Sequence, residues 1–470
     1  MECNQLRLSP HMADVYIIYA KENRDIAVKV HDLLLKSWTV WMDDLIVGDF
    51  ATAIKENLQK AACVVALYSE SASKPAVTDE LRLATKYGKK IIPLQLDDSD
   101  PPYSFGNLST VNFQHWSGEP DHEAFKLLQV KIQEVVPAMR HAERLSSLES
   151  NTLPIPNIFM SVSSHETQFK PAEALSVLKA HGTKSILVSA YDLRRSEDKD
   201  QMIEEIKAYR ERGGFVLIDS GNYEADRTED ETWTAAEFHQ ALLETPHDCA
   251  FCFDNLEPSS DLEMAVEEVI QAFERDRLNT SAPVYPIVHV SQDEEGLKRL
   301  PNIVFEVANR IRPGVIAIAE RELGPGLALR ARTMKRVRTQ LQNLPFYQPI
   351  HLLGTGNPWS ISVLVAAGAD TFDGLEWCRF SIDPTRGRLH HFQHFDFFKH
   401  LWNRTPLLDI VDTDPKIKYA GKVALYNLEY YEEFGQLMHS MIASNDATLF
   451  ATGIGLTAPE LKKLFPEIFQ

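Results

Sequence analysis

The sequence predicts an α/β protein of two domains, a small doubly wound parallel sheet followed by a (β/α)8 barrel. Short apolar runs alternate with amphipathic segments along the chain, as expected for parallel strands joined by helices. Eight such repeats fall within about 220 residues after residue 157, the number that a barrel needs. Three of the runs end in aspartate, at Asp219, Asp254 and Asp373. Because barrel strands end at one rim, these carboxylates are expected to share a pocket.

The first domain is expected to span residues 1–140. Apolar runs mark its predicted strands, which are Val15–Tyr19, Val40–Met42, Cys63–Leu67 and Ile91–Leu96. Helical spacing of apolar residues marks its predicted helices, which are Ile26–Lys36, Ala51–Lys60, a helix from Asp79, and His122–Met139. Residues 141–156 hold Ser, Asn and Pro in close succession, so they are expected to form a linker.

The second domain is expected to span residues 157–470. Its predicted strands are Ile158–Val162, Ser185–Ser189, Phe215–Asp219, Cys249–Asp254, Val284–Val290, Val315–Ala319, Ile350–Leu353 and Asp370–Asp373. Helical spacing is found between them, for example at Asp198–Arg212, Ala235–Glu244, Leu262–Arg275, Leu327–Leu341 and Ser360–Ala367. A long helix is predicted in the tail, over Val423–Ala443.

Composition and charge limit the classes of function. The chain has 470 residues and a net charge of −19, of which residues 141–470 carry −15. This acidity disfavours tight binding of nucleic acid without excluding it. No apolar run reaches the roughly 18 residues of a membrane span, and the start lacks a signal-peptide pattern, so a cytoplasmic protein without a membrane partner is expected. The five cysteines are expected to be reduced thiols.

Four segments of the first domain carry motifs in a defined order. They are Asp14–Ala20 (DVYIIYA), Val40–Phe50 with its VWMDD and GDF groups, Val64–Ser69 (VVALYS) and Val77–Leu81 (VTDEL). With the predicted elements between them, they resemble the successive boxes of the TIR domain family, from residue 14 to about 137. The resemblance implies a flavodoxin-like fold. It also implies either the assembly of signalling complexes, with self-association into a homo-oligomer, or the cleavage of NAD at its nicotinamide–ribose bond.

The resemblance implies that Glu80 is the catalytic residue of a NAD-cleaving domain. Nicotinamide is already a cationic leaving group in NAD, so its departure needs only stabilisation of an oxocarbenium-like sugar by a carboxylate. Tyr19 and Asp43 correspond to positions that line the family's nucleotide cleft, and Phe50 to a position in its mobile loop. Ala76 stands where the family usually has tryptophan, which puts nicotinamide stacking in question. The alternative for Glu80 is a solvent-exposed acid in the first turn of a helix.

The second domain carries motifs of another family. Leu217–Tyr223 (LIDSGNY), Phe253–Asp254 and Tyr285–His289 (YPIVH) lie at three consecutive predicted strands. Leu352–Pro358 (LLGTGNP) and Gly368–Asp373 (GADTFD) lie at the last two. Together these motifs resemble the tRNA-guanine (queuine) transglycosylase family over residues 155 to about 445. The resemblance implies a TIM barrel that exchanges a nucleobase by double displacement.

The same resemblance implies a role for each rim residue. Asp373 would be the nucleophile that attacks the ribose carbon, and Asp219 would be the acid/base that manages protons on the two bases. Asp254 would hydrogen-bond the amide edge of a purine, and Tyr223 would stack on it. An acid/base pair of this kind works only if the environment separates the two pKa values, and the sequence does not show which one rises.

Three departures from the family pattern bear on this activity. His289 stands where the family has a glutamine that reads the purine. No cysteine follows Cys378, so the family's zinc ligands are absent and no metal is expected. Trp377–Arg379 replaces the family's Pro-Thr-Arg, although Arg379 keeps the expected offset from Asp373. A pocket for a free base or nucleoside is therefore favoured over exchange in intact tRNA.

The fusion leads to one main hypothesis and two rivals. The main hypothesis is a prokaryotic immune effector for antiviral defence, in which the barrel senses a nucleobase or nucleoside and the TIR domain consumes NAD. The first rival is an active transglycosylase, with nucleophile Asp373, that acts on nucleic acid or a nucleoside and is regulated by the TIR domain. The second rival is a scaffold in which both domains only bind.

Some polar clusters have simpler interpretations. The rim aspartates could each cap a helix. Cys249 and Cys252 match a C-x-x-C pattern, but on a strand they would point to opposite faces as core thiols. His390, His391 and His394 have spacings that a metal could use, although no second half of such a site is evident.

Overall fold

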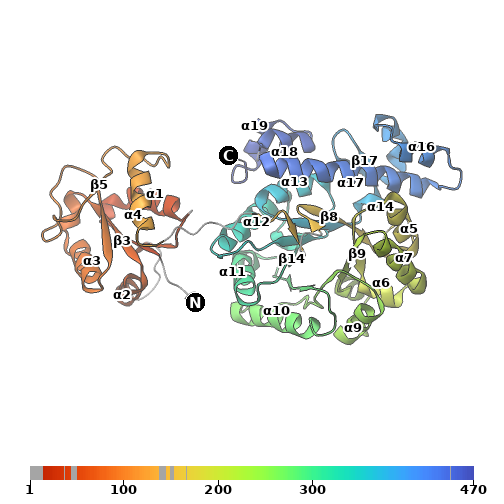
Figure 1. Cartoon of the computed structure of the whole chain (residues 1–470), viewed down its shortest axis with the longest axis horizontal. Helices are drawn as coiled ribbons and strands as arrows, with labels where there is room; N and C mark the ends of the chain where they lie inside the picture. The colour runs from red at the N-terminus through yellow and green to blue at the C-terminus, as the bar shows by residue number, and fades with distance from the viewer. Residues whose placement is uncertain are drawn as a thin grey trace, which may run out of the picture. The chain divides into compact units, whose positions relative to one another are not determined.

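The computed structural model describes residues 14–35, 37–43, 50–136, 144–148, 153–165, 167–444 and 446–469, with only the backbone for 50–53. Contacts divide the chain into two compact units, Met1–Ala142 and Glu143–Gln470. Figure 1 shows the first unit in red to orange and the second in yellow to blue. Among the described helices, none combines the length and apolarity needed to span a bilayer.

The first unit is built on a five-stranded parallel sheet in the order β2-β1-β3-β4-β5. The strands are β1 (Val15–Ile18), β2 (Val40–Trp41), β3 (Cys63–Tyr68), β4 (Lys90–Gln95) and β5 (Val111–Asn112). The α-helices among its described residues are α1 (Arg24–Leu34), α2 (Phe50–Lys60), α3 (Pro75–Lys86) and α4 (Glu123–Gln133). The predicted doubly wound domain is confirmed, and the structure adds the short edge strand β5.

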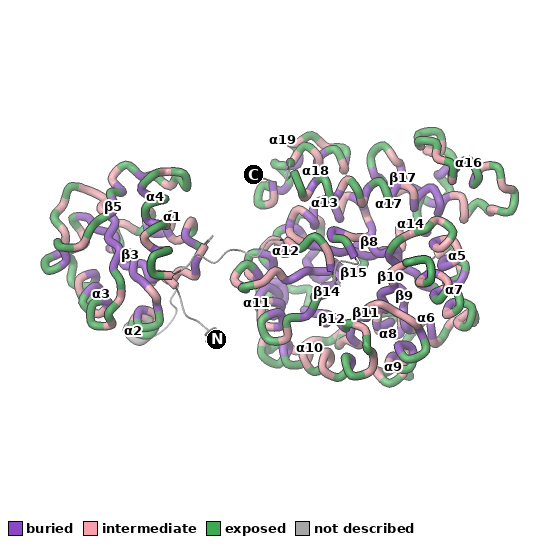
Figure 2. The backbone as a smooth tube through the Cα atoms, in the orientation of Figure 1, coloured by how far each residue is buried: buried purple, intermediate pink, exposed green. Residues whose placement is uncertain are grey.

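Helices cover both faces of this sheet because its strands are apolar on both sides. Successive residues of a strand point to opposite faces, so Ile17 packs with α1 and α4. Tyr16 and Ile18 pack on the other face, in the core that also holds Leu58 of α2 and Leu81 of α3. Strands β1 and β3 are accordingly buried along their length, as Figure 2 shows for β3.

The second unit contains a parallel sheet of nine strand segments. They are β8 (Asn157–Val162), β9 (Ser185–Ser189), β10 (Phe215–Asp219), β11 (Cys249–Phe251), β12 (Val284–Tyr285), β13 (Ile287–Val288), β14 (Ile316–Ala319), β15 (Ile350–Leu353) and β16 (Thr371–Gly374). The last strand, β16, pairs with the first, β8. The predicted barrel architecture is confirmed.

Segments β12 and β13 are two halves of one strand that is interrupted at Pro286. Proline has no N–H to donate to a ladder, but Pro286 O accepts from Ala317 N at 2.9 Å. β12 pairs with β11, whereas β13 pairs with β14. The nine segments therefore make eight positions around the barrel, in agreement with the eight predicted repeats.

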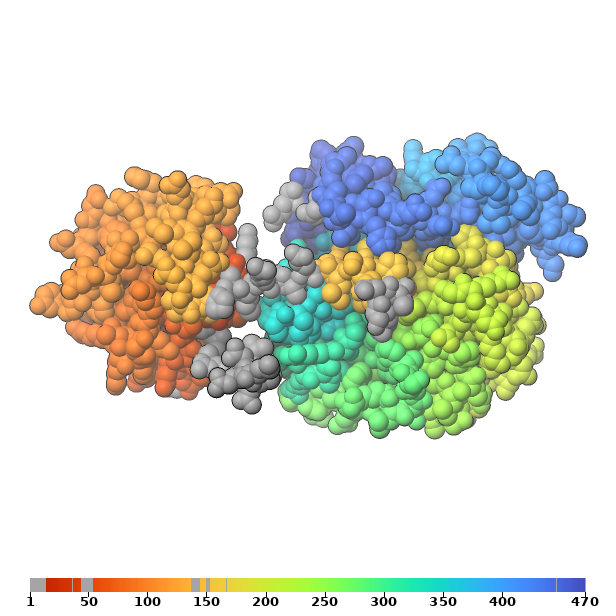
Figure 3. Space-filling view, in the orientation of Figure 1, coloured from red at the N-terminus to blue at the C-terminus, as the bar shows by residue number. Residues whose placement is uncertain are grey.

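Helices surround the barrel and a helical tail follows it. The helices between strands are α5 (Pro171–His181), α6 (Ala190–Arg195), α7 (Lys199–Glu211), α8 (Asn222–Arg227), α9 (Ala235–Glu244), α10 (Leu262–Asp276), α11 (Glu294–Ile311), α12 (Leu327–Leu341) and α13 (Pro358–Ala367). After β16 come α14 (Glu376–Arg379), the antiparallel hairpin β17 (Phe380–Asp383) and β18 (Arg388–His391), α16 (Pro406–Thr413), α17 (Tyr419–Ser444), α18 (Ala447–Gly453) and α19 (Ala458–Leu464). Helix α17 packs on α5, α13 and α14. In Figure 3 this tail is the blue layer along one flank of the unit.

Part of the segment expected to be a linker packs on the barrel. Strands β6 (Ser147–Leu148) and β7 (Leu153–Pro154) form a hairpin. Leu148, Leu153 and Ile155 are buried in one cluster with inward-facing residues of the strands. The described residues of this segment therefore cover one end of the barrel interior, because its apolar side chains outweigh its turn-forming composition.

A buried carboxylate ties this segment to the sheet. Asp370, immediately before β16, is fully buried. It accepts hydrogen bonds from Arg144 Nε at 2.7 Å and Arg338 Nη2 at 2.8 Å. Tyr347 Oη at 2.7 Å and Ile350 N at 2.9 Å complete the set. These donors fix the start of the strand that carries Asp373.

Replacement of Asp370 is expected to destabilise the barrel strongly. Asp370→Asn leaves two largely buried guanidinium groups without their shared anion, a loss of about 3–5 kcal/mol. The measurement is urea unfolding of the full chain. Glu197→Gln is the control, since Glu197 is 96% exposed and its loss is worth under about 1 kcal/mol. Equal unfolding midpoints for the two variants would contradict this account of Asp370.

Candidate active sites

In the first unit, Glu80 lies on α3 and contacts strand β1. The hydroxyl of Tyr16 donates a hydrogen bond to Glu80 Oε2 at 3.1 Å. Helix α3 begins at Pro75, so Glu80 lies in its second turn, and its side chain is half-buried. The alternative of an exposed acid in the first turn does not describe this residue.

The surroundings of Glu80 bring its pKa close to neutral pH. Burial raises the pKa of Glu80 to about 7, with the Tyr16 hydrogen bond lowering it and the charge of Asp43 raising it. Burial and the neighbouring Glu80 also raise the pKa of Tyr16 far above its usual range, so Tyr16 remains a donor. At neutral pH about half of the Glu80 side chains are ionised, and a small change in the site would alter that fraction.

Two further side chains lie near this pair, from Trp41 at the end of β2 and from Asp43 just after it. Trp41 stacks on Tyr16 with ring centroids 4.6 Å apart. Asp43 Oδ1 is buried and lacks a hydrogen-bond partner among the described residues. The site therefore groups two carboxylates, a phenol and an indole at the carboxyl edge of the sheet.

The other predicted residues of this site are placed less closely. Tyr19 is half-buried and packs against the core on the opposite face of the sheet from Tyr16. Phe50 begins α2, but its side chain lies outside the described residues. Ala76 is exposed in the first turn of α3. Among the described residues, Trp41 is the tryptophan that lies closest to the Tyr16–Glu80 pair.

In the second unit, a cavity of about 390 Å³ opens at the carboxyl ends of the barrel strands. Its lining includes all six residues predicted for this rim, which are Asp219, Tyr223, Asp254, His289, Asp373 and Arg379. They come from the ends of four strands, β10, β11, β13 and β16, or from the segments just after them. The volume lies within the range of small-molecule pockets.

The carboxylate of Asp373 is held by donors from three neighbouring elements. Ser161 Oγ of β8 donates to Asp373 Oδ2 at 2.8 Å, and Gly354 N, after β15, donates to Oδ1 at 2.8 Å. His351 Nε2 of β15 lies 3.2 Å from the same Oδ1. The carboxylate is therefore fixed in orientation within the cavity.

Asp254, His289 and Glu322 form a chain of hydrogen-bonded side chains with His289 in the middle. His289 Nε2 lies 2.6 Å from Asp254 Oδ2, and its Nδ1 lies 2.8 Å from Glu322 Oε1. Burial alone would lower the pKa of His289, but the hydrogen bonds to the two carboxylates raise it to about 10. His289 is thus an imidazolium that donates to both acids. Ser220 Oγ donates to the other oxygen of Asp254 at 2.8 Å.

Asp219 has a different environment. Burial, followed by the charges of Glu224, Asp254 and Asp373, raises the pKa of Asp219 well above its usual range. It accepts a hydrogen bond from Gly221 N at 3.3 Å. Among the rim aspartates, Asp219 is therefore the one whose surroundings most favour the protonated form.

Two more acids of the cavity are shifted in the same direction. Burial raises the pKa of Glu224 to about 7, and Asp192 adds to the effect. Burial also raises the pKa of Glu376 to about 7. A Cβ at Gly356 would lie only 1.8 Å from Glu376 Oε2, so the glycine is what allows this carboxylate to pack there. Protonation of these acids limits the negative charge of the cavity.

The mouth of the cavity carries aromatic and basic groups. Tyr223 is 43% exposed, and the guanidinium carbon of Arg321 lies 4.5 Å from its ring centroid. Arg227 and Arg379 also line the cavity. An exposed phenol ring at a carboxylate-lined pocket suits stacking on a planar base.

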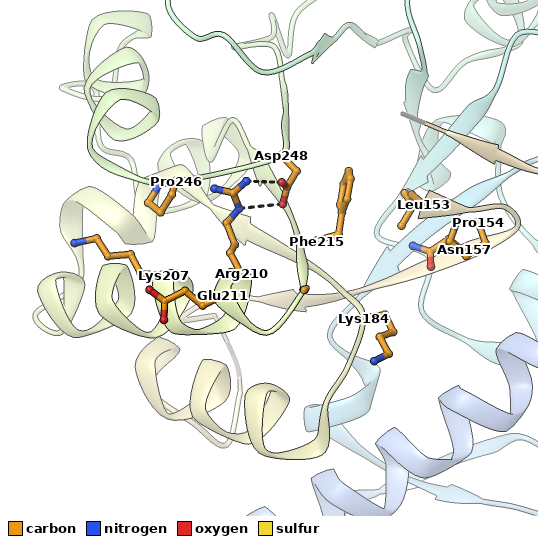
Figure 4. A pocket seen from close by; sticks show the side chains of 12 residues that line it. Leu153, Pro154, Asn157, Lys184, Lys207, Arg210, Glu211, Phe215, Pro246 and Asp248 are labelled. Atoms are coloured by element: carbon orange, nitrogen blue, oxygen red, sulfur yellow. Dashed lines mark hydrogen bonds and ion pairs between the residues drawn. The ribbon is translucent and has the colours of Figure 1, made fainter. Parts of the chain in front are cut away.

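A larger hollow of about 840 Å³ lies at the opposite end of the strands (Figure 4). Its central polar feature is an ion pair, with Arg210 Nη2 at 2.5 Å from Asp248 Oδ1. Asp248 also accepts from Val216 N at 2.8 Å, which ties two strands together. Amino-end groups of a barrel serve stability in most enzymes, so we assign the chemistry to the smaller carboxyl-end cavity.

The site contains residues that the sequence analysis did not select. Ser161, His351 and Glu322 contact the predicted aspartates or His289, and Glu224 and Glu376 line the same cavity. The sequence contained one sign of Glu322, because the acidic turn Glu320–Leu323 directly follows the sixth strand of the barrel. Cys249 and Cys252 are buried core thiols.

The fold and the two sites define a TIR-type α/β unit joined to a transglycosylase-like barrel. Residues 15–129 match the TIR domain family. A tRNA-guanine(15) transglycosylase of Methanopyrus kandleri is 26% identical over 262 residues, which are 51% of this chain and 52% of that protein. The chain thus spans about half the length of this relative. It carries an N-terminal TIR domain and a barrel with distant similarity to tRNA-guanine transglycosylase.

The Asp254–His289–Glu322 chain predicts a pH-dependent stability. Folding raises the pKa of His289 from 6.5 to about 10, so its stabilisation is fully present below pH 6.5 and is lost as the pH rises through about 10. We expect His289→Gln to lower the unfolding free energy by on the order of 3 kcal/mol at pH 6, and by much less above about pH 10. Urea unfolding across this range measures it, with the exposed His400→Gln as control. A difference that does not change with pH would refute the charged state of His289.

Proposed function

We propose that the TIR domain cleaves NAD at the nicotinamide–ribose bond under the control of a nucleobase or nucleoside bound in the barrel. The observation that carries the proposal is the Tyr16–Glu80 pair: a half-buried carboxylate with a pKa near 7, beside an aromatic ring and a second acid. Such a poised carboxylate is typical of a catalytic group rather than of a solvated helix face.

The proposed reaction is heterolysis of a glycosidic bond. The bond between the pyridinium nitrogen and ribose C1′ breaks, its electron pair goes to the nitrogen, and neutral nicotinamide leaves. Ionised Glu80 stabilises the positive charge that develops on the sugar. Water that attacks C1′ and loses a proton gives ADP-ribose, whereas attack by a group of the same nucleotide gives a cyclic product. Tyr16 holds the carboxylate in place by its hydrogen bond.

The barrel cavity supports the sensing half of the proposal. It combines an exposed ring, Tyr223, with the fixed acceptor Asp254 in a pocket that several other acids and arginines also line. The unit is acidic overall, which favours a small ligand over a polyanion. TIR domains commonly self-associate, so we propose that the chain acts as a homo-oligomer.

A second candidate function is base exchange by the barrel itself. The rim holds one acid whose pKa burial raises, Asp219, and one carboxylate oriented by three donors, Asp373. This separation of roles is what an acid/base and a nucleophile need. Asp373 would attack C1′ of a nucleoside as Asp219 protonates the departing base, and an incoming base would then release the sugar.

NAD cleavage is expected to require ionised Glu80. Glu80→Gln should lower the rate at least about 100-fold without lowering the melting temperature, because it removes a carboxylate that burial disfavours. In the wild type the rate should rise with pH to a plateau, with a midpoint near 7. Tyr16→Phe should move that midpoint upward, because it removes the hydrogen bond that holds the pKa of Glu80 down. Release of nicotinamide by the full chain is the measurement.

The matched control is Asp79→Asn, an exposed acid next to Glu80 that should keep the rate within about twofold. A wild-type rate that is flat between pH 5.5 and 8.5 would contradict the assigned role of Glu80. If Glu80→Gln kept full biological activity, the scaffold rival would be favoured.

Base exchange predicts a covalent intermediate. Incubation with nucleosides, followed by acid quench and mass spectrometry, should show a sugar adduct on Asp373 that is absent in Asp373→Asn. The Asp219→Asn variant should accumulate less adduct, since the leaving base is not protonated. Absence of any adduct and of labelled guanine incorporation would leave the barrel as a binding module.

A further inference from the structure

A second cluster of chemically reactive side chains lies on the flank of the barrel, away from both candidate sites. It joins the end of α5 to the middle of α17, two helices that pack on each other. His181 is the last residue of α5, and Gly182 follows it in the left-handed conformation with φ 86°. Glu429 and Glu432 lie three residues apart on α17. Because residues three apart share one helix face, both carboxylates are directed to the same region.

The imidazole of His181 is buried and incompletely partnered. Its side chain is 4% exposed. The Nδ1 atom lies 3.0 Å from Thr183 Oγ1, whereas Nε2 has no hydrogen-bond partner among the described residues. Nε2 instead faces Glu429 Oε1 at 3.4 Å and Glu432 Oε2 at 4.0 Å.

The carboxylates are arranged as ligands rather than as ion-pair partners. Thr405 Oγ1 donates to Glu429 Oε2 at 2.7 Å, which leaves Oε1 directed at the imidazole. A hydrogen bond of this kind from a neighbouring side chain is usual for carboxylates that bind metals. Glu432 is 63% exposed and free to adjust its side chain.

We propose that His181, Glu429 and Glu432 bind one divalent transition-metal ion of the Zn²⁺ type, with water at the open position. The three ligand atoms lie within 4.8 Å of one another. Bonds of about 2.0–2.2 Å in tetrahedral geometry bring ligand atoms to about 3.4 Å apart, so only the exposed Glu432 side chain has to move. The imidazole favours a transition metal over Mg²⁺ or Ca²⁺, which prefer oxygen ligands.

The site would fasten the tail helix to the barrel. Two residues to either side of Glu429, Asn427 and Tyr431 hold the region after the last strands. The Tyr431 hydroxyl donates to Gly356 O at 2.7 Å, and Asn427 Nδ2 donates to Trp377 O at 2.9 Å. Both acceptors lie near Glu376 at the cavity. Metal binding would thus stabilise the wall of the cavity without contacting its ligand. The inference does not depend on the proposed function.

The experiment titrates Co²⁺ into the full chain after chelator treatment, followed by visible absorption, with Zn²⁺ competition and a Mg²⁺ arm. One equivalent of Co²⁺ should bind and be displaced by Zn²⁺ but not by Mg²⁺. His181→Gln and Glu432→Gln should each weaken binding at least about tenfold. Glu432 is exposed, so its variant keeps the fold intact. Zn²⁺ should raise the melting temperature of the wild type but not of Glu432→Gln.

Two variants serve as matched controls. Glu433→Gln removes the neighbouring exposed acid of α17, and His391→Gln removes a histidine of the β17–β18 hairpin; both should bind Co²⁺ within about twofold of the wild type. The proposal is overturned if no stoichiometric binding occurs at micromolar metal. It is equally overturned if Glu432→Gln binds as the wild type does, or if His391→Gln abolishes binding.

Discussion

Burial of carboxylates costs free energy, and the way in which each site offsets this cost decides what its acids can do. Asp370 is fully buried and has four donors, so it acts as a structural anion that closes the barrel. Asp373, three residues further on, has donors for both oxygens and is set for chemistry or binding. Glu80 and Asp219 have weaker support, and their pKa values rise.

The cost of burying a carboxylate also distinguishes the candidate site at Glu80 from the candidate site in the barrel. Glu80 stands with a single weak donor and a pKa near neutrality, so its charge responds to small changes around it. Such a group suits an activity that is switched on by assembly or by a ligand elsewhere. The barrel acids, in contrast, are fixed by His289, Ser161 and Gly354 before any ligand arrives. A preorganised pocket suits selective binding.

Much of the fold could be predicted because apolar runs report buried parallel strands directly. The rim positions of Asp219, Asp254 and Asp373 followed from their place at strand ends. The partners did not, because Ser161 and His351 lie inside strands and are polar residues whose inward direction depends on register. The role of His289 also required coordinates, since its charge depends on Glu322, 33 residues away in the sequence, as well as on Asp254.

The linker shows a second limit of sequence reasoning. Ser, Asn and Pro indicated a connection, whereas Leu148, Leu153 and Ile155 are buried against the strands. Similarly, Pro286 divides one strand into two pairing halves without opening the barrel. In both cases tertiary burial decided the structure over local preference.

Coupling between the two units is the central claim, and NAD consumption by the purified full chain tests it most directly. The assay would use a panel of nucleobases and nucleosides beside Glu80→Ala and Asp254→Ala. The account predicts that one ligand accelerates NAD loss in the wild type and that both variants abolish this acceleration. NAD loss that is unaffected by every ligand, or that proceeds equally in Asp254→Ala, would contradict it.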